Sequence, residues 1–291
     1  MDVLEFPEEA KSLFLGIDQR FSENPGYVAA LKECERALFT PGSDFSQIQR
    51  EWNPISESLA CSALSVETYF FLRCLEELYV RYENAGISEK IFWDTAADLR
   101  FKLSECHAVH GIWGTFVGSW NPPFYRMERF ALGRFQYERT PFPSDGYEKK
   151  GAIIEKGEPV LNFHIPSSGR MPKEVRLDSY REAYRFYGTS RKDGLLVLIC
   201  DSWLLYPNHR SILPESSNIL SFMDDFEIIS SREADNFPDQ WRVFGNTEGL
   251  SPSDLPEKTS LQRAFKSYLL SGGKMGSGFG VILFDGEKIV G

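Results

Sequence analysis

The chain has 291 residues, with 42 acidic against 32 basic side chains, a formal net charge of −10 and a pI near 5.1. This acidic balance argues against general nucleic-acid binding, which requires a basic face, and no run of about 18 apolar residues is present to span a membrane. Five cysteines without a CxxC pair, and an acidic start without an apolar run, predict reduced thiols and a cytoplasmic protein.

The N-terminal part of the chain has the pattern of helices. Apolar residues recur at helical spacing in three segments. Ser65 has the residue type of an N-cap for the second segment, and Gly111 follows the third as a stop. The expected helices cover residues 26–39, 66–84 and 89–110.

After the break at Asn121-Pro122-Pro123 the pattern changes to short strands that alternate with helices. The run 195–200, Leu-Leu-Val-Leu-Ile-Cys, is continuously apolar, as in a strand that is covered on both faces. Further strands are expected at residues 128–138, 159–165, 226–229, 241–244 and 280–284. Further helices are expected at residues 172–187, 217–222 and 260–270.

This order predicts two domains, residues 1–121 and 122–291. The first is helical and the second is a mixed α/β, or α+β, layer fold. Charge divides at the same place. Residues 1–121 hold 10 basic and 19 acidic side chains, whereas residues 122–291 hold 22 and 23. A polyanionic ligand is therefore expected on the second domain, where repulsion is smaller.

Three segments of the second domain resemble a bacterial family of GNAT-like acyltransferases that are joined to a helical N-acyltransferase N-terminal domain. The segments are 163–169 (Phe-His-Ile-Pro-Ser-Ser-Gly), 200–207 (Cys-Asp-Ser-Trp-Leu-Leu-Tyr-Pro) with 213–219, and 263–280. The resemblance implies a GNAT-like mixed sheet flanked by helices. It also implies transfer of an acyl group, expected to be acetyl, from acyl-CoA to an amine on a small molecule or peptide, without a metal.

An acyl-CoA enzyme needs a cradle for the diphosphate, and one loop has the right context. It joins the strand at 159–165 to the following helix, and backbone N–H groups at a helix start bind phosphates well. Ser167, Ser168, Gly169 and Arg170 are the expected cofactor-binding residues, through hydroxyl donors, close backbone approach and positive charge. The alternative is a plain connecting loop with a helix cap.

Catalytic candidates follow the same two strands. Asp201 follows the buried strand at 195–200, at the end of a strand where open α/β sheets commonly face ligands. Tyr206 lies where acetyltransferases often place the tyrosine that protonates the thiolate, and His164 is a residue that can relay a proton near neutral pH. The family usually has His where this chain has Asp201. A structural role is the alternative for each of the three.

The resemblance also marks substrate-binding candidates, which are Ser202, Trp203 and Asn218. Ser202 and Trp203 directly follow Asp201, and Asn218 belongs to the same family segment. For Trp203 the alternative is a core filler. We further expect the strands at 159–165 and 195–200 to lie side by side and to splay at their carboxyl ends, where pantetheine enters acetyltransferases.

Two other groups of residues give weaker evidence for a functional site. Cys106, His107 and His110 have possible metal spacing, but no fourth ligand is evident and histidine also suits the last turn of a helix. The glycine-rich run 272–280 leaves a helix and enters a strand, the reverse of a phosphate-binding order, and is interpreted as a helix stop and turn.

Two functions of other classes stay open beside the acyltransferase. One is a ligand-binding or regulatory protein that keeps the fold and has lost the chemistry, which the atypical loop and Asp201 favour. The other is a structural partner whose aromatic surface forms a dimer, since aromatic residues make up 14% of the chain. Binding of acyl-CoA and turnover of its thioester separate the three.

Overall fold

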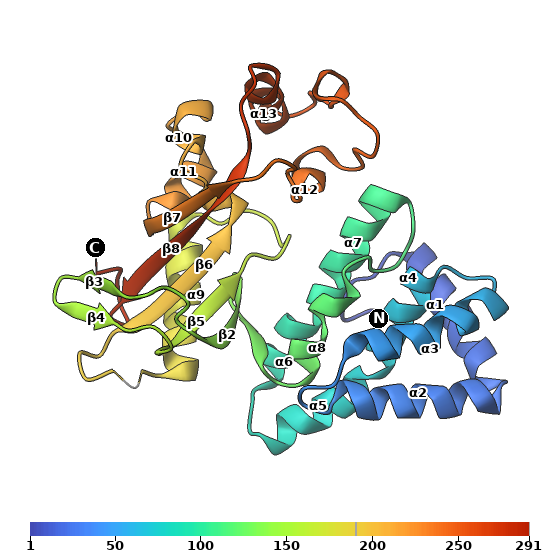
Figure 1. Ribbon diagram of the computed structural model, residues 1–291. Helices are drawn as coiled ribbons and strands as arrows, with labels where there is room; N and C mark the ends of the chain where they lie inside the picture. Colours follow the sequence, from blue (N-terminus) through green and yellow to red (C-terminus); the bar gives the residue numbers. More distant parts are fainter. Residues whose placement is uncertain (190, 291) are drawn as a thin grey trace. The chain divides into compact units, whose positions relative to one another are not determined.

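The computed structural model describes residues 1–189 and 191–290, which form two compact units (Figure 1). The helical unit comprises residues 1–131 together with the short segment Pro166–Ser168, and the sheet unit comprises the rest of the chain. A helical N-terminal region followed by a mixed sheet with flanking helices confirms the predicted fold class. Among the described residues no helix combines the length and apolarity that a membrane crossing demands.

The helical unit contains the three predicted helical segments and others that the pattern did not reveal. Two predicted segments are each interrupted once, at Cys74 and at Ala97. The N-cap of α4 is Ser62, whose side chain accepts a hydrogen bond from the Leu64 N–H, so the prediction of Ser65 as the cap was wrong. The helices are α1 (Glu8–Ser22), α2 (Pro25–Leu38), α3 (Phe45–Ser58), α4 (Ala63–Arg73), α5 (Leu75–Asn84), α6 (Glu89–Ala96), α7 (Asp98–His110), η1 (Gly118–Trp120) and α8 (Pro122–Tyr125).

A carboxyl group is buried inside this unit. Glu67 on α4 is 7% exposed and accepts a hydrogen bond from Gln49 Nε2 at 2.9 Å. Its carboxyl group occupies the space beside Gly118, where an added Cβ would lie 1.3 Å from Glu67 Oε1. Burial raises the pKa of Glu67 to about 7, because an ionised carboxylate loses its hydration there.

This buried carboxyl makes the stability of the protein fall as the pH rises. The pKa of Glu67 is about 7 in the folded protein and 4.5 for an ordinary glutamate, so the unfolded chain ionises first and stability decreases between these pH values. The shift corresponds to about 3 kcal/mol. We expect Glu67→Gln to be more stable than the wild type by up to about 3 kcal/mol at pH 8, and no more stable at pH 4.5. Urea unfolding of both proteins across this pH range measures the difference in their stability. A difference that does not change with pH contradicts the prediction.

The sheet unit is built around one six-stranded sheet in the order β1-β2-β5-β6-β8-β7, whose edge strand β1 contains the boundary between the two units, with a separate two-stranded hairpin, β3-β4. β5 and β6 are parallel, and β2–β5, β6–β8 and β7–β8 are antiparallel. The elements are β1 (Arg129–Leu132), β2 (Phe135–Pro141), β3 (Tyr147–Lys149), β4 (Ala152–Ile154), β5 (Pro159–His164), α9 (Lys173–Tyr187), β6 (Leu196–Ser202), η2 (Trp203–Leu205), α10 (His209–Ile212), α11 (Asn218–Met223), β7 (Glu227–Glu233), α12 (Gln240–Phe244), η3 (Pro252–Asp254), α13 (Ser260–Leu270) and β8 (Gly276–Phe284).

The two faces of the sheet are covered differently because strand side chains alternate between them. On one face, Tyr180 of α9 packs its ring against Phe135 and Phe163, and Phe222 of α11 joins the same aromatic group. We call this the helix face. The opposite face, here the hairpin face, carries an aliphatic and aromatic core with the β3–β4 hairpin. Its members are Phe142, Tyr147, Ala152, Ile154, Val160, Val197, Ile199, Phe279, Val281 and Leu283.

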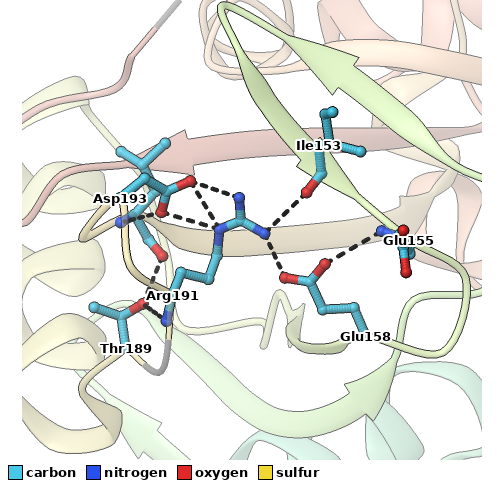
Figure 2. A network of polar contacts seen from close by, with 7 residues as sticks. Ile153, Glu155, Glu158, Thr189, Arg191 and Asp193 are labelled. Atoms are coloured by element: carbon cyan, nitrogen blue, oxygen red, sulfur yellow. Dashed lines mark hydrogen bonds and ion pairs between the residues drawn. The ribbon is translucent and has the colours of Figure 1, made fainter.

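One arginine ties the hairpin to the segment before β6 (Figure 2). Arg191 forms an ion pair with Glu158, donates to the Ile153 carbonyl oxygen at 3.2 Å and pairs with Asp193 at 2.5 Å. Asp193 in turn accepts from the Leu195 N–H at 3.0 Å. The side chain of Arg191 is only 15% exposed, so these charge-assisted bonds fix the hairpin on the sheet.

The glycine-rich run 272–280 follows the end of a helix, turns and enters a strand, as expected. Gly272 has φ +85° just after α13, and β8 then begins at Gly276. Within β8, a Cβ on Gly278 would lie 2.1 Å from the Leu205 carbonyl oxygen, so glycine lets η2 lie directly on the strand. The predicted strand at 241–244 was wrong, because the chain forms the short helix α12 there. Its Val243 carbonyl oxygen accepts from Gln262 Nε2 of α13 at 2.9 Å.

Candidate active site

The two predicted strands lie side by side and part at their carboxyl ends, which confirms that expectation. The parallel ladder between β5 and β6 contains the pairs Leu161–Leu198 and Asn162–Ile199. Beyond them β5 continues to His164 along β2, while β6 continues to Ser202 along β8. Each strand therefore follows its outer neighbour, and their facing edges are no longer bonded to each other.

His164 and Asp201 lie at equivalent positions, just beyond the point where the two strands part. Asn162 is the register partner of Ile199, and His164 and Asp201 each follow two residues later. Because side chains alternate, His164 lies on the same face as Val160, and Asp201 on the same face as Ile199, which is the hairpin face. The two residues therefore lie on the same face of the sheet, one on each of the two strands that border the end of the ladder.

His164 belongs to a compact polar group. Its Nε2 lies 2.7 Å from Glu138 Oε1, on the neighbouring strand β2, and 3.3 Å from Asn162 Nδ2. Asn162 Nδ2 also donates to Glu138 Oε1 at 3.2 Å. The side chains of His164 and Glu138 are 20% and 21% exposed, so they are half-buried and still reachable. A carboxylate that holds one imidazole nitrogen fixes the tautomer and the ring orientation.

Asp201, Ser202 and Trp203 line one cavity, which we call the strand-end cavity. It measures about 290 Å³ and is also lined by Arg232, Asp239 and Ser277. Asp201 Oδ2 accepts from Arg232 of β7 at 2.8 Å, and both side chains are exposed. Ser202 caps η2, accepting from the Leu204 N–H at 3.2 Å. Trp203 packs its ring edge-on against Phe237 and Phe265. The sequence-predicted trio is therefore brought together.

Tyr206 and Asn218 do not line the strand-end cavity. Tyr206 is 2% exposed, and its hydroxyl accepts from Asn208 Nδ2 at 2.9 Å and donates to Glu233 Oε1 at 3.3 Å. Burial, with the nearby Tyr268 and Glu233 adding to it, raises the pKa of Tyr206 to about 12. This makes it a weaker acid than a free tyrosine. Asn218 is an exposed residue at the start of α11 and does not line the strand-end cavity.

The predicted cofactor loop is exposed from Ser167 to Arg170 and is held from beneath by Arg134. Arg134 is 8% exposed and donates to the carbonyl oxygens of Gly169 at 2.8 Å and Arg170 at 3.4 Å. Burial lowers the pKa of Arg134 to about 10, so it stays a cation at neutral pH. Gly169 has φ +101°, a conformation that favours glycine.

The loop leads into α9, whose N-terminus has no side-chain cap. The N-cap is Pro172, whose side chain cannot accept a hydrogen bond, and the helix then runs for 15 residues. Uncapped N–H groups at such a helix start attract anions. The Arg170 side chain is exposed and has no hydrogen bond or ion pair with any residue in the described part of the chain.

Ser167 lies in the predicted loop and already has a hydrogen-bond partner. Pro166–Ser168 belongs to the helical unit, and the Ser167 hydroxyl donates to Glu105 Oε1 of α7. Glu105 is also paired with Lys102 at 3.1 Å, and both side chains are buried. The hydroxyl of Ser167 is therefore already engaged. Ser168 has an exposed side chain, and its role stays a prediction.

In the Cys106, His107 and His110 cluster, the two imidazole rings pack against aromatic rings. His107 stacks on Trp113 with ring centroids 3.6 Å apart, and His110 packs edge-on against Phe116 at 4.9 Å. Cys106 is buried, and burial raises the pKa of its thiol to about 11. Within residues 1–189 and 191–290, no group of three His, Cys, Asp or Glu side chains is placed to hold a metal ion.

Sequence reasoning missed four residues of this site, namely Glu138, Asn162, Arg134 and Arg232. The strand pattern carried a signal for one of them. Residues 160, 162 and 164 share one strand face, so Asn162 could have been assigned to the face of His164. Glu138, Arg134 and Arg232 come from other strands and turns, and only the register of the sheet brings them here.

Comparison with known proteins gives two family matches that together span most of the chain. Residues 1–127 match the N-acyltransferase N-terminal domain, and residues 130–282 match the GNAT-like C-terminal domain. No curated protein matches the sequence.

Solved acyltransferase structures share the fold. One is an acyltransferase mutant in complex with octanoyl-CoA, with a TM-score of 0.75 and 22% identity over 96% of this chain and 85% of that chain. Another is an acyltransferase in complex with decanoyl-CoA and teicoplanin, with a TM-score of 0.75 and 22% identity over 97% and 85%. The parted strands, the loop before α9 and both family matches lead to one conclusion. The chain belongs to the family that joins an N-acyltransferase N-terminal domain to a GNAT-like C-terminal domain.

Proposed function

We propose that this protein transfers an acyl group from acyl-CoA to an amine. The observation that carries the proposal is the end of the β5–β6 ladder, where the Glu138–His164 pair and Asp201 flank two unbonded strand edges. Unbonded backbone groups at that place are available to a pantetheine arm, which carries amides of its own. The solved acyltransferases of the same fold contain octanoyl-CoA or decanoyl-CoA.

The diphosphate of CoA would bind at the loop from Ser168 to Arg170 and the uncapped start of α9. Arg134 turns the carbonyl oxygens of Gly169 and Arg170 inward, away from an anion. Backbone N–H groups and the helix dipole then favour negative charge. Arg170 would add a charge-assisted contact.

In the reaction, the amine nitrogen attacks the thioester carbon, the C–S bond breaks and CoA leaves as a thiolate. The amine must lose a proton, and His164 is the base that we assign. An imidazole that donates from Nε2 to Glu138 has its acceptor at Nδ1, so the proton would move to Nδ1. The product is an amide, and the proton is finally released to solvent or to the thiolate.

The acyl length is open to a direct test. Acetyl-CoA is the donor expected from the sequence, whereas the solved structures contain medium-chain acyl-CoA. We propose acyl-CoA as the donor class. Calorimetric titration with acetyl-, octanoyl- and decanoyl-CoA, followed by detection of released CoA thiol with a mixture of primary amines, tests the function. Binding with amine-dependent thiol release supports it, and absence of acyl-CoA binding contradicts it.

Arg170 gives a second test of the cofactor loop. A charge-assisted contact is worth roughly 1.5–3 kcal/mol, so Arg170→Ala should weaken CoA binding about tenfold or more. The loss should shrink at high salt because screening already weakens the wild-type contact. Arg185→Ala, an exposed position in the last turn of α9, is the control and should leave the affinity unchanged. Equal affinities for both variants would remove Arg170 from the site.

A non-catalytic ligand-binding protein is the second candidate. Two observations favour it, namely the Arg232 ion pair that engages Asp201 and the raised pKa of Tyr206, which makes it a poor proton donor. Under this alternative acyl-CoA binds and no amine releases its thiol. The thiol assay above separates the two functions.

A further inference from the structure

A second cavity adjoins the strand-end cavity. It lies in the segment 234–275, which joins β7 to β8 and contains α12, η3 and α13. This insertion cavity measures about 360 Å³. Ala234, Phe237 and Pro238 line both cavities, so the two are neighbours that share these residues. Together they have the size of a site for a small molecule.

The two cavities have different chemistry. The strand-end cavity contains two carboxylates, each in an ion pair: Asp201 with Arg232 at 2.8 Å and Asp239 with Arg242 at 2.9 Å. The insertion cavity has one ion pair, between Asp235 and Lys274 at 2.9 Å, and otherwise a mainly apolar wall. That wall includes Phe237, Trp241, Leu250, Leu255, Leu269 and Met275.

Leu250 is the member of this wall that water reaches most. It is 42% exposed, whereas Leu255 and Met275 are 3% and 1% exposed. Leu270, one residue beyond Leu269 on α13, is 57% exposed and lines neither cavity. The apolar wall therefore has an accessible side at Leu250, where a bound group would gain contact area.

We propose that the two cavities together bind the acyl acceptor, and that this acceptor is a primary amine with an apolar or aromatic body. The proposal rests on the proposed function. The ammonium lies by Asp201 and Asp239, and the body extends past Phe237 toward Trp241 and Leu250. Asp201 and His164 each follow the last ladder pair by two residues, so this orientation puts the amine at the same edge of the sheet as the base.

The charged groups of the strand-end cavity favour the acceptor over the acyl chain as the occupant of the two cavities. A fatty acyl chain has no polar group to replace water, and its passage would desolvate two ion pairs, Asp201 with Arg232 and Asp239 with Arg242. An ammonium can donate to carboxylate oxygens beside the arginines that pair with them, and an apolar body is complementary to the insertion cavity. An amphipathic amine satisfies both ends.

Leu250→Glu tests the proposal, with Leu270→Glu as the matched control. Both leucines are exposed, so neither substitution should prevent folding. Calorimetry without acyl-CoA measures binding of 2-phenylethylamine and of ethylamine. The wild type should bind 2-phenylethylamine at least about tenfold more tightly, because the ring is buried. Leu250→Glu should remove most of that preference and Leu270→Glu should keep it.

Titration of each variant with acetyl-CoA and octanoyl-CoA separates the possible outcomes. Unchanged acyl-CoA affinity in Leu250→Glu, with loss of the aromatic preference, supports the acceptor assignment. A selective loss of octanoyl-CoA affinity overturns it, because the cavity then holds the acyl chain. An absence of aromatic preference in the wild type also overturns it. Amine binding without any acyl-CoA binding leaves the acceptor cavity standing and refutes the proposed transferase function.

Discussion

Asp225→Ala is expected to destabilise the protein by about 3–5 kcal/mol, because it leaves the Arg176 guanidinium buried without a counter-charge. Arg176 is 1% exposed and binds Asp225 through two contacts, Nε to Oδ2 at 2.6 Å and an Nη2 bond to Oδ1 at 3.0 Å. Tyr180 donates to the same carboxylate at 3.1 Å. Arg176 also donates to the Met171 carbonyl oxygen at 2.8 Å, so the pair fixes the chain where it enters α9.

The neighbouring residue supplies the control. Asp224 pairs with Arg210 at 2.7 Å, but both side chains are more than half exposed. Asp224→Ala should therefore cost less than about 1 kcal/mol. Urea unfolding of the two variants measures the difference. The double variant Arg176→Met with Asp225→Leu should recover part of the loss, since it removes both buried charges. Equal stabilities of Asp224→Ala and Asp225→Ala would contradict the buried-pair account.

His164→Ala is expected to lower the rate of acyl transfer by about 10²–10⁴-fold, the usual contribution of a positioned general base. Its affinity for acyl-CoA should stay within about twofold, because the imidazole acts on the amine and not on the diphosphate. Glu138→Gln should also slow the reaction, and its pH–rate profile should shift, because Glu138 acts through the imidazole that it orients.

His110→Ala controls for the loss of a histidine. His110 lies in the helical unit against Phe116 and should be dispensable for transfer. Single-turnover rates with saturating acyl-CoA separate chemistry from binding in all three variants. A His164→Ala protein that transfers at the wild-type rate would exclude His164 as the base.

The fold was predictable where the pattern of apolar residues agrees with the residues that begin or end helices and strands. The apolar run 195–200 and its surroundings became β6, and Gly111 ends α7 with φ +69°. Patterns of apolar residues did not reveal the breaks at Cys74 and Ala97, because both residues are compatible with a helix and the turn angle is set by packing. The segment 241–244 was too short for periodicity to distinguish a strand from the helix α12.

The site was predictable where it follows directly from strand ends. His164 and Asp201 are two residues past the last ladder pair, so their strands alone locate them. The partners Glu138 and Arg232 depend on the register of β2 and β7, which no local pattern encodes. Ser167 was assigned to the diphosphate from its residue type, and its bond to Glu105 comes from a helix 62 residues away in the sequence.

Hydrogen–deuterium exchange of the intact protein, with and without octanoyl-CoA, tests the central claim most directly. Acyl-CoA bound between the parted strands should protect peptides that cover residues 163–175 and 199–206, since it would occupy the unbonded strand edges and the start of α9. Binding of octanoyl-CoA with protection confined to residues 234–275, or with no protection of the β5 and β6 ends, would contradict the account.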